Sequence, residues 1–112
     1  SVWQFYLEGN PQASHFPFPA QLLEPANKAE VGLNNSNSLL FQWNGNDLDG
    51  DIESYDLYLG EFTDALTQVR EGLTNNQTEL QLLENTLYFW QVISIDREGN
   101  RSYSEIFQFQ TF

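Results

Sequence analysis

The sequence predicts an all-β protein with the architecture of a two-sheet antiparallel β-sandwich of about seven strands. Short segments in which apolar and polar residues alternate recur along the chain, and a period of two puts successive side chains on opposite faces of a strand. Clusters of Asn, Gly, Asp and Ser separate these segments at the spacing typical of a sandwich. No segment shows the period of an amphipathic helix, so the sequence favours strands throughout.

The composition limits both the size of the core and the classes of partner. A chain of 112 residues supplies one small core, and its 15% of aromatic residues help to fill that core. No cysteine is present, which excludes disulfides, thiolate metal sites and thiol redox chemistry. The 16 acidic residues against 4 basic ones give a net charge of −12, which repels nucleic acids and anionic membranes. No stretch reaches the roughly 20 apolar residues that span a bilayer, so no membrane insertion is expected.

The beginning of the chain repeats the pattern of its ending. Residues 2–7 alternate aromatic with other side chains much as residues 106–111 do. A recurrence after about one domain's length predicts tandem repeats, with residues 1–8 as the last strand of a preceding repeat. The large apolar side chains of this strand need a partner. We therefore expect it to pair along a sheet edge of its own domain, or along that of a neighbouring copy in a strand-mediated dimer.

Residues 9–19 are predicted to be a linker between repeats. They hold three of the 4 prolines and no formally charged side chain, a composition that disfavours helix and favours an extended connector. The domain itself is therefore expected over residues 20–112. Its strands, as alternation predicts them, are Gln21–Glu24, Ser38–Asn44, Ser54–Gly60, Thr67–Glu71, Gln77–Leu82, Leu87–Asp96 and Glu105–Phe112.

Alternation also assigns a face to each side chain of these strands. The large apolar side chains share one face of each strand, and burying each contributes about 1.5–3 kcal/mol. We expect a core around Trp43, Trp90, Phe107 and Phe109, joined by Leu39, Phe41, Tyr55, Leu57, Leu59, Thr78, Leu80, Leu82, Tyr88 and Val92. The opposite faces carry polar side chains that are expected to face solvent, namely Gln42, Asp56, Gln91, Gln108 and Gln110.

The order of several core residues resembles a known family. Trp43 lies near the end of one expected strand, and Tyr55 and Leu57 lie in the next. Leu82 precedes Tyr88 by six residues. This arrangement resembles a fibronectin type III module, which has an immunoglobulin-like topology. In that family the Leu and Tyr form the tyrosine corner, where the phenol hydroxyl bonds to nearby backbone, and the resemblance implies this role for Leu82 and Tyr88.

A subgroup of these modules, found in secreted and surface proteins of bacteria, reads much like residues 19–112. The family consists largely of spacer, adhesion and scaffold modules. The resemblance therefore implies a non-catalytic spacer or interaction module of a multidomain extracellular, cell-surface or periplasmic protein. Residues 97–100 lack the Arg-Gly-Asp of some integrin-binding members, so no integrin function is implied. The stretches that carry the resemblance are Leu23–Asn27, Phe41–Trp43, Asp47–Asp51, Tyr55–Gly60, Tyr88–Val92 and Asp96–Asn100.

Residues 46–53 place oxygen-bearing side chains at alternate positions around a glycine. Calcium sites gather about six to eight oxygens in this manner, which makes Asp47, Asp49, Asp51 and Glu53 a candidate calcium site. An EF-hand would need a bidentate carboxylate at its last position, where this chain has an aromatic residue. Asp, Asn and Gly are also ordinary turn residues, so a plain turn is the alternative interpretation.

The sequence offers no catalytic constellation, and we predict that the chain is not an enzyme. His15 is the only histidine and lies in the expected linker, which removes metal pairs and Ser-His-Asp arrangements. Paired carboxylates hydrolyse glycosides within a cleft built from converging elements, which a sandwich of this size rarely provides. We therefore expect no resident cofactor, with calcium as the one candidate ion.

The aromatic residues with outward parity, Tyr58, Phe89 and Tyr103, are candidates for contact with a ligand. Rings on a sheet surface stack against sugars or other apolar faces, but outward rings also pack across strands without any ligand. The expected partners are therefore neighbouring repeats and a protein or glycan ligand. The alternative to a spacer is a calcium- or carbohydrate-binding accessory module of a surface protein or of a polysaccharide-degrading enzyme.

Overall fold

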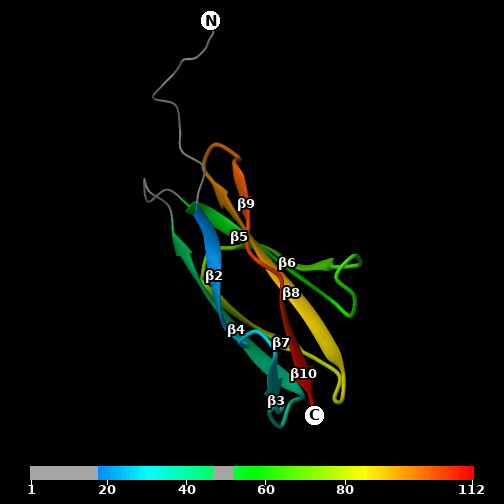
Figure 1. Cartoon of the computed structure of the whole chain (residues 1–112). Coiled ribbons are helices and arrows are strands. Elements are labelled where there is room, and N and C mark those ends of the chain that lie inside the picture. The colour runs from blue at the N-terminus through cyan, green and yellow to red at the C-terminus, as the bar shows by residue number, and fades with distance from the viewer. Residues whose placement is uncertain (1–17, 47–51) are drawn as a thin grey trace, which may run out of the picture.

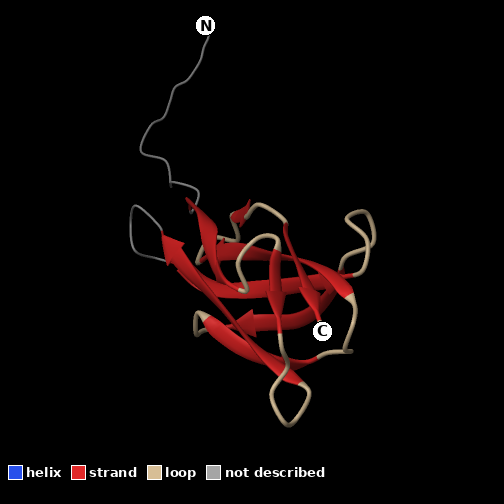
Figure 2. Cartoon of the chain, turned by 60° about the horizontal axis from the view of Figure 1, so that its bottom comes forward, coloured by secondary structure: helices blue, strands red, loops and turns tan. Residues whose placement is uncertain are grey.

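Every regular element of the described chain is a β-strand, and the strands form two sheets (Figure 1, Figure 2). The structure, a computed structural model, describes residues 18–46 and 52–112, so the expectations for residues 1–17 and 47–51 lie outside it. Within these ranges no helix is long and apolar enough to cross a membrane. The predicted all-β sandwich is confirmed. Its strands are β2 (Phe18–Glu24), β3 (Ala29–Val31), β4 (Ser38–Asn46), β5 (Ile52–Gly60), β6 (Thr67–Leu73), β7 (Gln77–Gln81), β8 (Leu87–Asp96), β9 (Arg101–Tyr103) and β10 (Phe107–Thr111).

The two sheets differ in size. The larger has the strand order β3-β10-β8-β5-β6, with β9 also pairing with β8, and the smaller has the order β2-β4-β7. The parallel pair is β3 with β10, and the other pairs are antiparallel. The chain passes from one sheet to the other on either side of β3, between β4 and β5, and on either side of β7. Strand β6 is an edge strand of the larger sheet, and β7 is an edge strand of the smaller one.

Two short strands go beyond those that alternation predicts. Strands β3 and β9 have 3 residues each, too few for a period of two to be recognised. They form because β3 pairs with β10 and β9 pairs with β8, and only the folded structure brings those segments together. Strand β2 begins at Phe18, inside the stretch that was expected to be linker. Pro19 fits there because β2 is an edge strand, where a missing N–H need not break a ladder bond.

The core lies between the two sheets and consists mainly of aromatic rings. Phe41, Trp43, Trp90 and Phe109 have 0% of their surface exposed, and Phe107 is half-buried beside them. The Phe41 ring meets the Trp90 ring edge-on, with ring centres 5.0 Å apart at 83°, and meets Phe109 at 5.7 Å. Such pairs add about 0.5–1.5 kcal/mol beyond burial itself. Because these rings come from strands of both sheets, they hold the two layers face to face.

Tyr55 of β5 reaches across to β4, where Gly45 leaves room for its ring. A Cβ atom at position 45 would collide with the Tyr55 hydroxyl and ring carbons. Tyr55 also packs edge-on against Trp43, with ring centres 5.6 Å apart. Its partial burial raises the pKa of the phenol. Since β4 and β5 belong to different sheets, this contact is a second tie between the layers.

Two hydroxyl groups fix the turn before β8. The Leu83 amide donates a hydrogen bond of 2.9 Å to the Tyr88 hydroxyl, and the side chain of Leu82 is buried beside it. The Thr111 hydroxyl donates to the Leu83 carbonyl at 2.7 Å and accepts from the Thr86 amide at 2.9 Å. The turn is therefore held by a tyrosine from its own strand and by a threonine from β10.

Candidate functional site

The outward face of the larger sheet gathers amides and aromatic rings from four adjacent strands, β6, β5, β8 and β10. Tyr58 on β5 lies opposite both Gln68 on β6 and Gln91 on β8. Phe89, the next outward residue of β8, lies opposite Gln108 on β10. Residues directly opposite one another point to the same side of a sheet, so these side chains share one surface. We name it the amide-aromatic face and define it by Tyr58, Gln68, Leu87, Phe89, Gln91, Gln108 and Gln110.

Hydrogen bonds orient part of this face. The Tyr58 hydroxyl donates to the side-chain oxygen of Gln68 at 3.1 Å, which fixes the ring beside the amide. The side-chain amide of Gln91 donates a hydrogen bond to the backbone carbonyl of Ser104 at 2.8 Å. Within the described residues the side-chain amide of Gln108 has no hydrogen-bond partner, so its donors and its acceptor are available to a ligand.

The amide-aromatic face carries no charged side chain, although the whole chain carries a net charge of −12. Charged groups stand at its margins. Glu30 on β3 lies opposite Gln110, and Arg101 on β9 lies near Asp56 on β5. The outward face of the smaller sheet likewise carries an exposed carboxylate, that of Glu79, on its edge strand. The centre of the larger sheet's outward face is therefore neutral, while charged groups lie at its margins.

Asp56 marks one margin of this face, and the prediction that it faces solvent is wrong. Only 3% of its surface is exposed. One carboxylate oxygen accepts a hydrogen bond of 3.0 Å from the Gly72 amide, and the other lies 3.6 Å from the guanidinium of Arg101. Gly72 has a φ of +68°, a conformation that glycine adopts at little cost. These partners satisfy a carboxylate that would be costly to bury alone.

The structure places the predicted outward aromatics on the same side of the larger sheet. Tyr58 and Phe89 are half-buried in neighbouring rows of the amide-aromatic face. Tyr103, on β9, lies opposite Ile93 of β8 and is 57% exposed. Ile93 is four residues beyond Phe89 on β8, a separation of about 13 Å along an extended strand. Tyr103 therefore stands apart from the other two rings.

The candidate calcium site falls largely outside the described residues. Asp47, Asp49 and Asp51 belong to the range that is not described, and Glu53 is exposed on β5. The described parts of the chain contain no group of three or more His, Cys, Asp or Glu side chains that could hold a metal ion. A calcium role for these four residues stays a prediction.

Asp96 lies opposite Ile52 in the ladder between β5 and β8, and it organises the turn that follows β8. Its carboxylate accepts hydrogen bonds from the amides of Glu98 and Asn100, each at 2.9 Å, and from the Asn100 side chain at 3.0 Å. Burial alone raises the pKa of Asp96, but these donors outweigh it and hold the pKa below its ordinary value. The carboxylate oxygens of Asp96 therefore stabilise the turn after β8.

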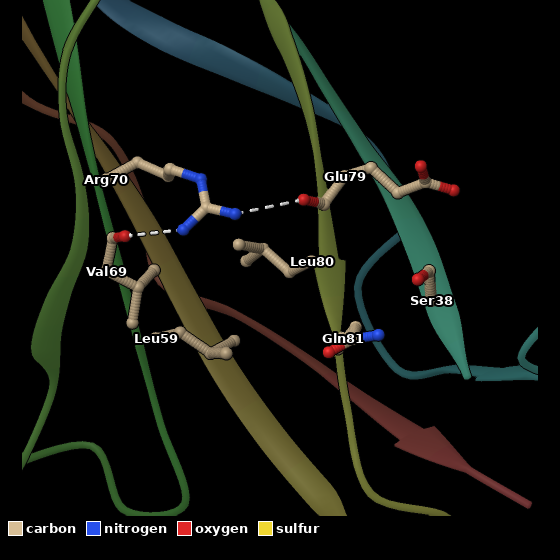
Figure 3. Close-up of a pocket in the computed structure, with 7 residues that line it drawn as sticks. All are labelled: Ser38, Leu59, Val69, Arg70, Glu79, Leu80 and Gln81. Atoms are coloured by element: carbon tan, nitrogen blue, oxygen red, sulfur yellow. Dashed lines mark hydrogen bonds between the residues drawn. The ribbon is translucent and has the colours of Figure 1, made fainter. Parts of the chain in front are cut away.

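A lateral cleft of about 540 Å³ opens between the edge strands β6 and β7 (Figure 3). Arg70 crosses its mouth, with its guanidinium donating to the Val69 carbonyl at 2.9 Å and to the Glu79 carbonyl at 3.2 Å. The lining combines apolar side chains with polar groups of both edges: Ser38, Leu59, Val69, Arg70, Glu79, Leu80 and Gln81. No acid-base pair forms among these lining residues. Sequence reasoning did not single out Arg70, because a lone arginine in a strand has no recognisable motif.

Comparison with known proteins identifies the fold. No protein-family model matches the sequence, and no curated protein matches it. An Fn3-like protein from Clostridium thermocellum has a TM-score of 0.62 and 16% identity, covering 90% of this chain and 96% of its own. The CbhA fibronectin(III)-like modules of the same organism have a TM-score of 0.59 and 19% identity, with 82% of this chain and 94% of theirs covered.

A larger protein contains a similar part. The β-1,2-glucanase from Parabacteroides distasonis has a TM-score of 0.65 and 16% identity over 89% of this chain, but the match covers only 13% of the glucanase. At these identities the likeness concerns the fold, and the fold is that of fibronectin type III-like modules.

Proposed function

We propose that this chain, which has a fibronectin type III-like fold, is a non-catalytic spacer and interaction module of a multidomain extracellular or cell-surface protein, one of several tandem repeats. The observation that carries the proposal is the path of the chain. The described chain enters the sandwich at one end through β2 and leaves it at the opposite end after β10 (Figure 1). Modules with such a path join end to end, and each adds its own length to the string.

The terminal strands are paired in a way that suits a module under tension. Strand β2 pairs with β4, and β10 pairs with both β8 and β3. Tension between the two ends acts along these strands, whereas the hydrogen bonds of antiparallel pairs run across them. Several hydrogen bonds must then break together before either strand leaves its sheet. This geometry supports a positional and mechanical role.

The end where the chain leaves also supports contact between repeats. Phe112 is 64% exposed and Leu83 is 65% exposed, and the two are linked through Thr111, whose hydroxyl donates to the Leu83 carbonyl. An adjoining repeat seated on this end would remove both side chains from water. The likeness of residues 2–7 to residues 106–111 supports the tandem arrangement. Under the same proposal, residues 1–8 would pair with a free edge strand, β6 or β7, in a strand-mediated dimer.

A second candidate is a calcium- or carbohydrate-binding accessory module of a polysaccharide-degrading enzyme. The amide-aromatic face favours the carbohydrate form of this candidate, and the similar part of a β-1,2-glucanase is consistent with it. Both candidates place the chain outside the cytoplasm and assign any catalysis to other domains.

Single-molecule stretching tests the spacer proposal. Because the chain has no cysteine, handles can be attached at cysteines added to its two ends. We expect the sandwich to resist and then unfold in one abrupt event, since its terminal strands must shear. Gradual extension at low force would contradict the proposal.

A further inference from the structure

We propose that the amide-aromatic face binds a neutral polysaccharide, with the rings of Tyr58 and Phe89 packing against sugar faces and the glutamine amides hydrogen-bonding to hydroxyls. The inference rests on the interaction role proposed above and names its ligand. It follows from the juxtaposition of two rings with amides that keep free donors or acceptors, Gln108 with all of them, on a sheet surface whose charged groups lie only at its margins.

The chemistry of the face matches a sugar polymer. A sugar ring presents C–H groups on its faces and hydroxyls at its edge. The half-buried rings of Tyr58 and Phe89 lie on adjacent strands in successive rows, so they offer apolar contacts to neighbouring sugar units. Gln91 and Gln108 lie beside them on β8 and β10, and a side-chain amide both donates and accepts, as a hydroxyl does.

The charge distribution selects among polymers. The chain's net charge of −12 repels anionic polysaccharides and nucleic acids everywhere, but the amide-aromatic face adds no local charge. A cationic partner would be drawn to the acidic surface elsewhere, where carboxylates such as Glu79 are exposed. A neutral polymer is neither attracted nor repelled by that charge, so the placement of rings and amides decides where it binds.

A protein partner fits this face less well. The centres of protein interfaces are rich in tightly packed apolar and aromatic groups. Here four glutamines accompany two rings and one leucine, and most of these side chains are half-buried in the sheet surface. Such a face offers many hydrogen bonds and little apolar area.

Affinity electrophoresis in native gels tests the inference. The strongly acidic chain will migrate well, and gels cast with hydroxyethylcellulose, xyloglucan or galactomannan are compared with a gel containing carboxymethylcellulose. We expect retardation by at least one neutral polymer and none by the carboxymethylated one. No retardation by any of the three neutral polymers, or equal retardation by carboxymethylcellulose, would overturn the inference.

Variants then locate the binding surface. We expect Tyr58→Ala to weaken binding about tenfold, because it removes a ring that packs against the sugar. We expect Gln108→Ala to weaken binding about threefold, because the loss of one hydrogen bond is worth about that much. Gln108 is not a member of the core, so Gln108→Ala reports on binding even if Tyr58→Ala folds poorly. Leu40→Ala, on the outward face of the smaller sheet, is the matched control and should bind as the unaltered chain does. Equal retardation of all variants would refute the site. The stretching experiment does not depend on these results, so the spacer proposal and the ligand can fail separately.

Discussion

Removing the hydroxyl of Tyr88 should destabilise the domain while leaving its core intact. In Tyr88→Phe the ring keeps its stacked contact with Phe109, whose centre lies 5.5 Å away. The Leu83 amide, however, loses the acceptor that now lies 2.9 Å away in a partly buried position. An amide left without a partner costs about 1–3 kcal/mol, and partial access to water places this case at about 1–2 kcal/mol. For a domain of about 100 residues, that lowers the melting temperature by about 5–15 °C.

Urea unfolding, followed by tryptophan fluorescence and by circular dichroism, measures this loss. We expect the midpoint to fall while the slope of the free energy against urea stays unchanged, because the same surface is exposed on unfolding. Tyr103→Phe is the matched control, since that side chain is 57% exposed. If Tyr88→Phe and the control are equally stable, the hydroxyl does not hold the turn and the reasoning fails.

Further substitutions probe the core, the tie between sheets and the turn after β8. Gly45→Ala should cost about 1–3 kcal/mol, because the added methyl collides with Tyr55, and denaturant unfolding that matches the unaltered chain would contradict this. Phe109→Ala empties a fully buried site and should cost about 3–5 kcal/mol in the same assay. The pKa of Asp96 is lower in the folded chain than its ordinary value of 3.8. Its stabilisation is therefore complete above that value and is lost as the pH falls through it toward the lower folded pKa. Asp96→Asn should flatten the fall in melting temperature over this acid range, and an unchanged pH profile would argue against the role of Asp96.

The sequence predicts the long strands well because alternation over many residues leaves few alternatives. Strand β8 runs over Leu87–Asp96, the range that the pattern predicts, and burial alternates along it from Leu87 to Val92. The same reasoning misses β3 and β9, whose three residues become strands only through partners far away in the chain. It also ends the linker too late, because Pro19 is compatible with an edge strand.

Surface properties depend on contacts that periodicity does not contain. Alternation puts Asp56 on the outward face, but the Gly72 amide and the Arg101 guanidinium that bury and satisfy it come from β6 and β9. The amide-aromatic face has a similar origin. Each of its residues has outward parity in the sequence, but the strand order and register are needed to bring Tyr58 and Gln108 to one surface.

Stretching the sandwich along two different directions tests the account most directly. One pair of handles sits at the two ends of the chain, which loads β2 and β10 in shear. The other pair of handles is attached at Phe112 and at a cysteine that replaces Glu84. These two positions lie at the same end of the sandwich, because the Thr111 amide donates a hydrogen bond to the Thr86 carbonyl there. That pull peels β10 from β8 one hydrogen bond at a time. The account predicts a distinctly higher unfolding force for the first pair, and equal forces in the two directions would contradict a module built to carry tension.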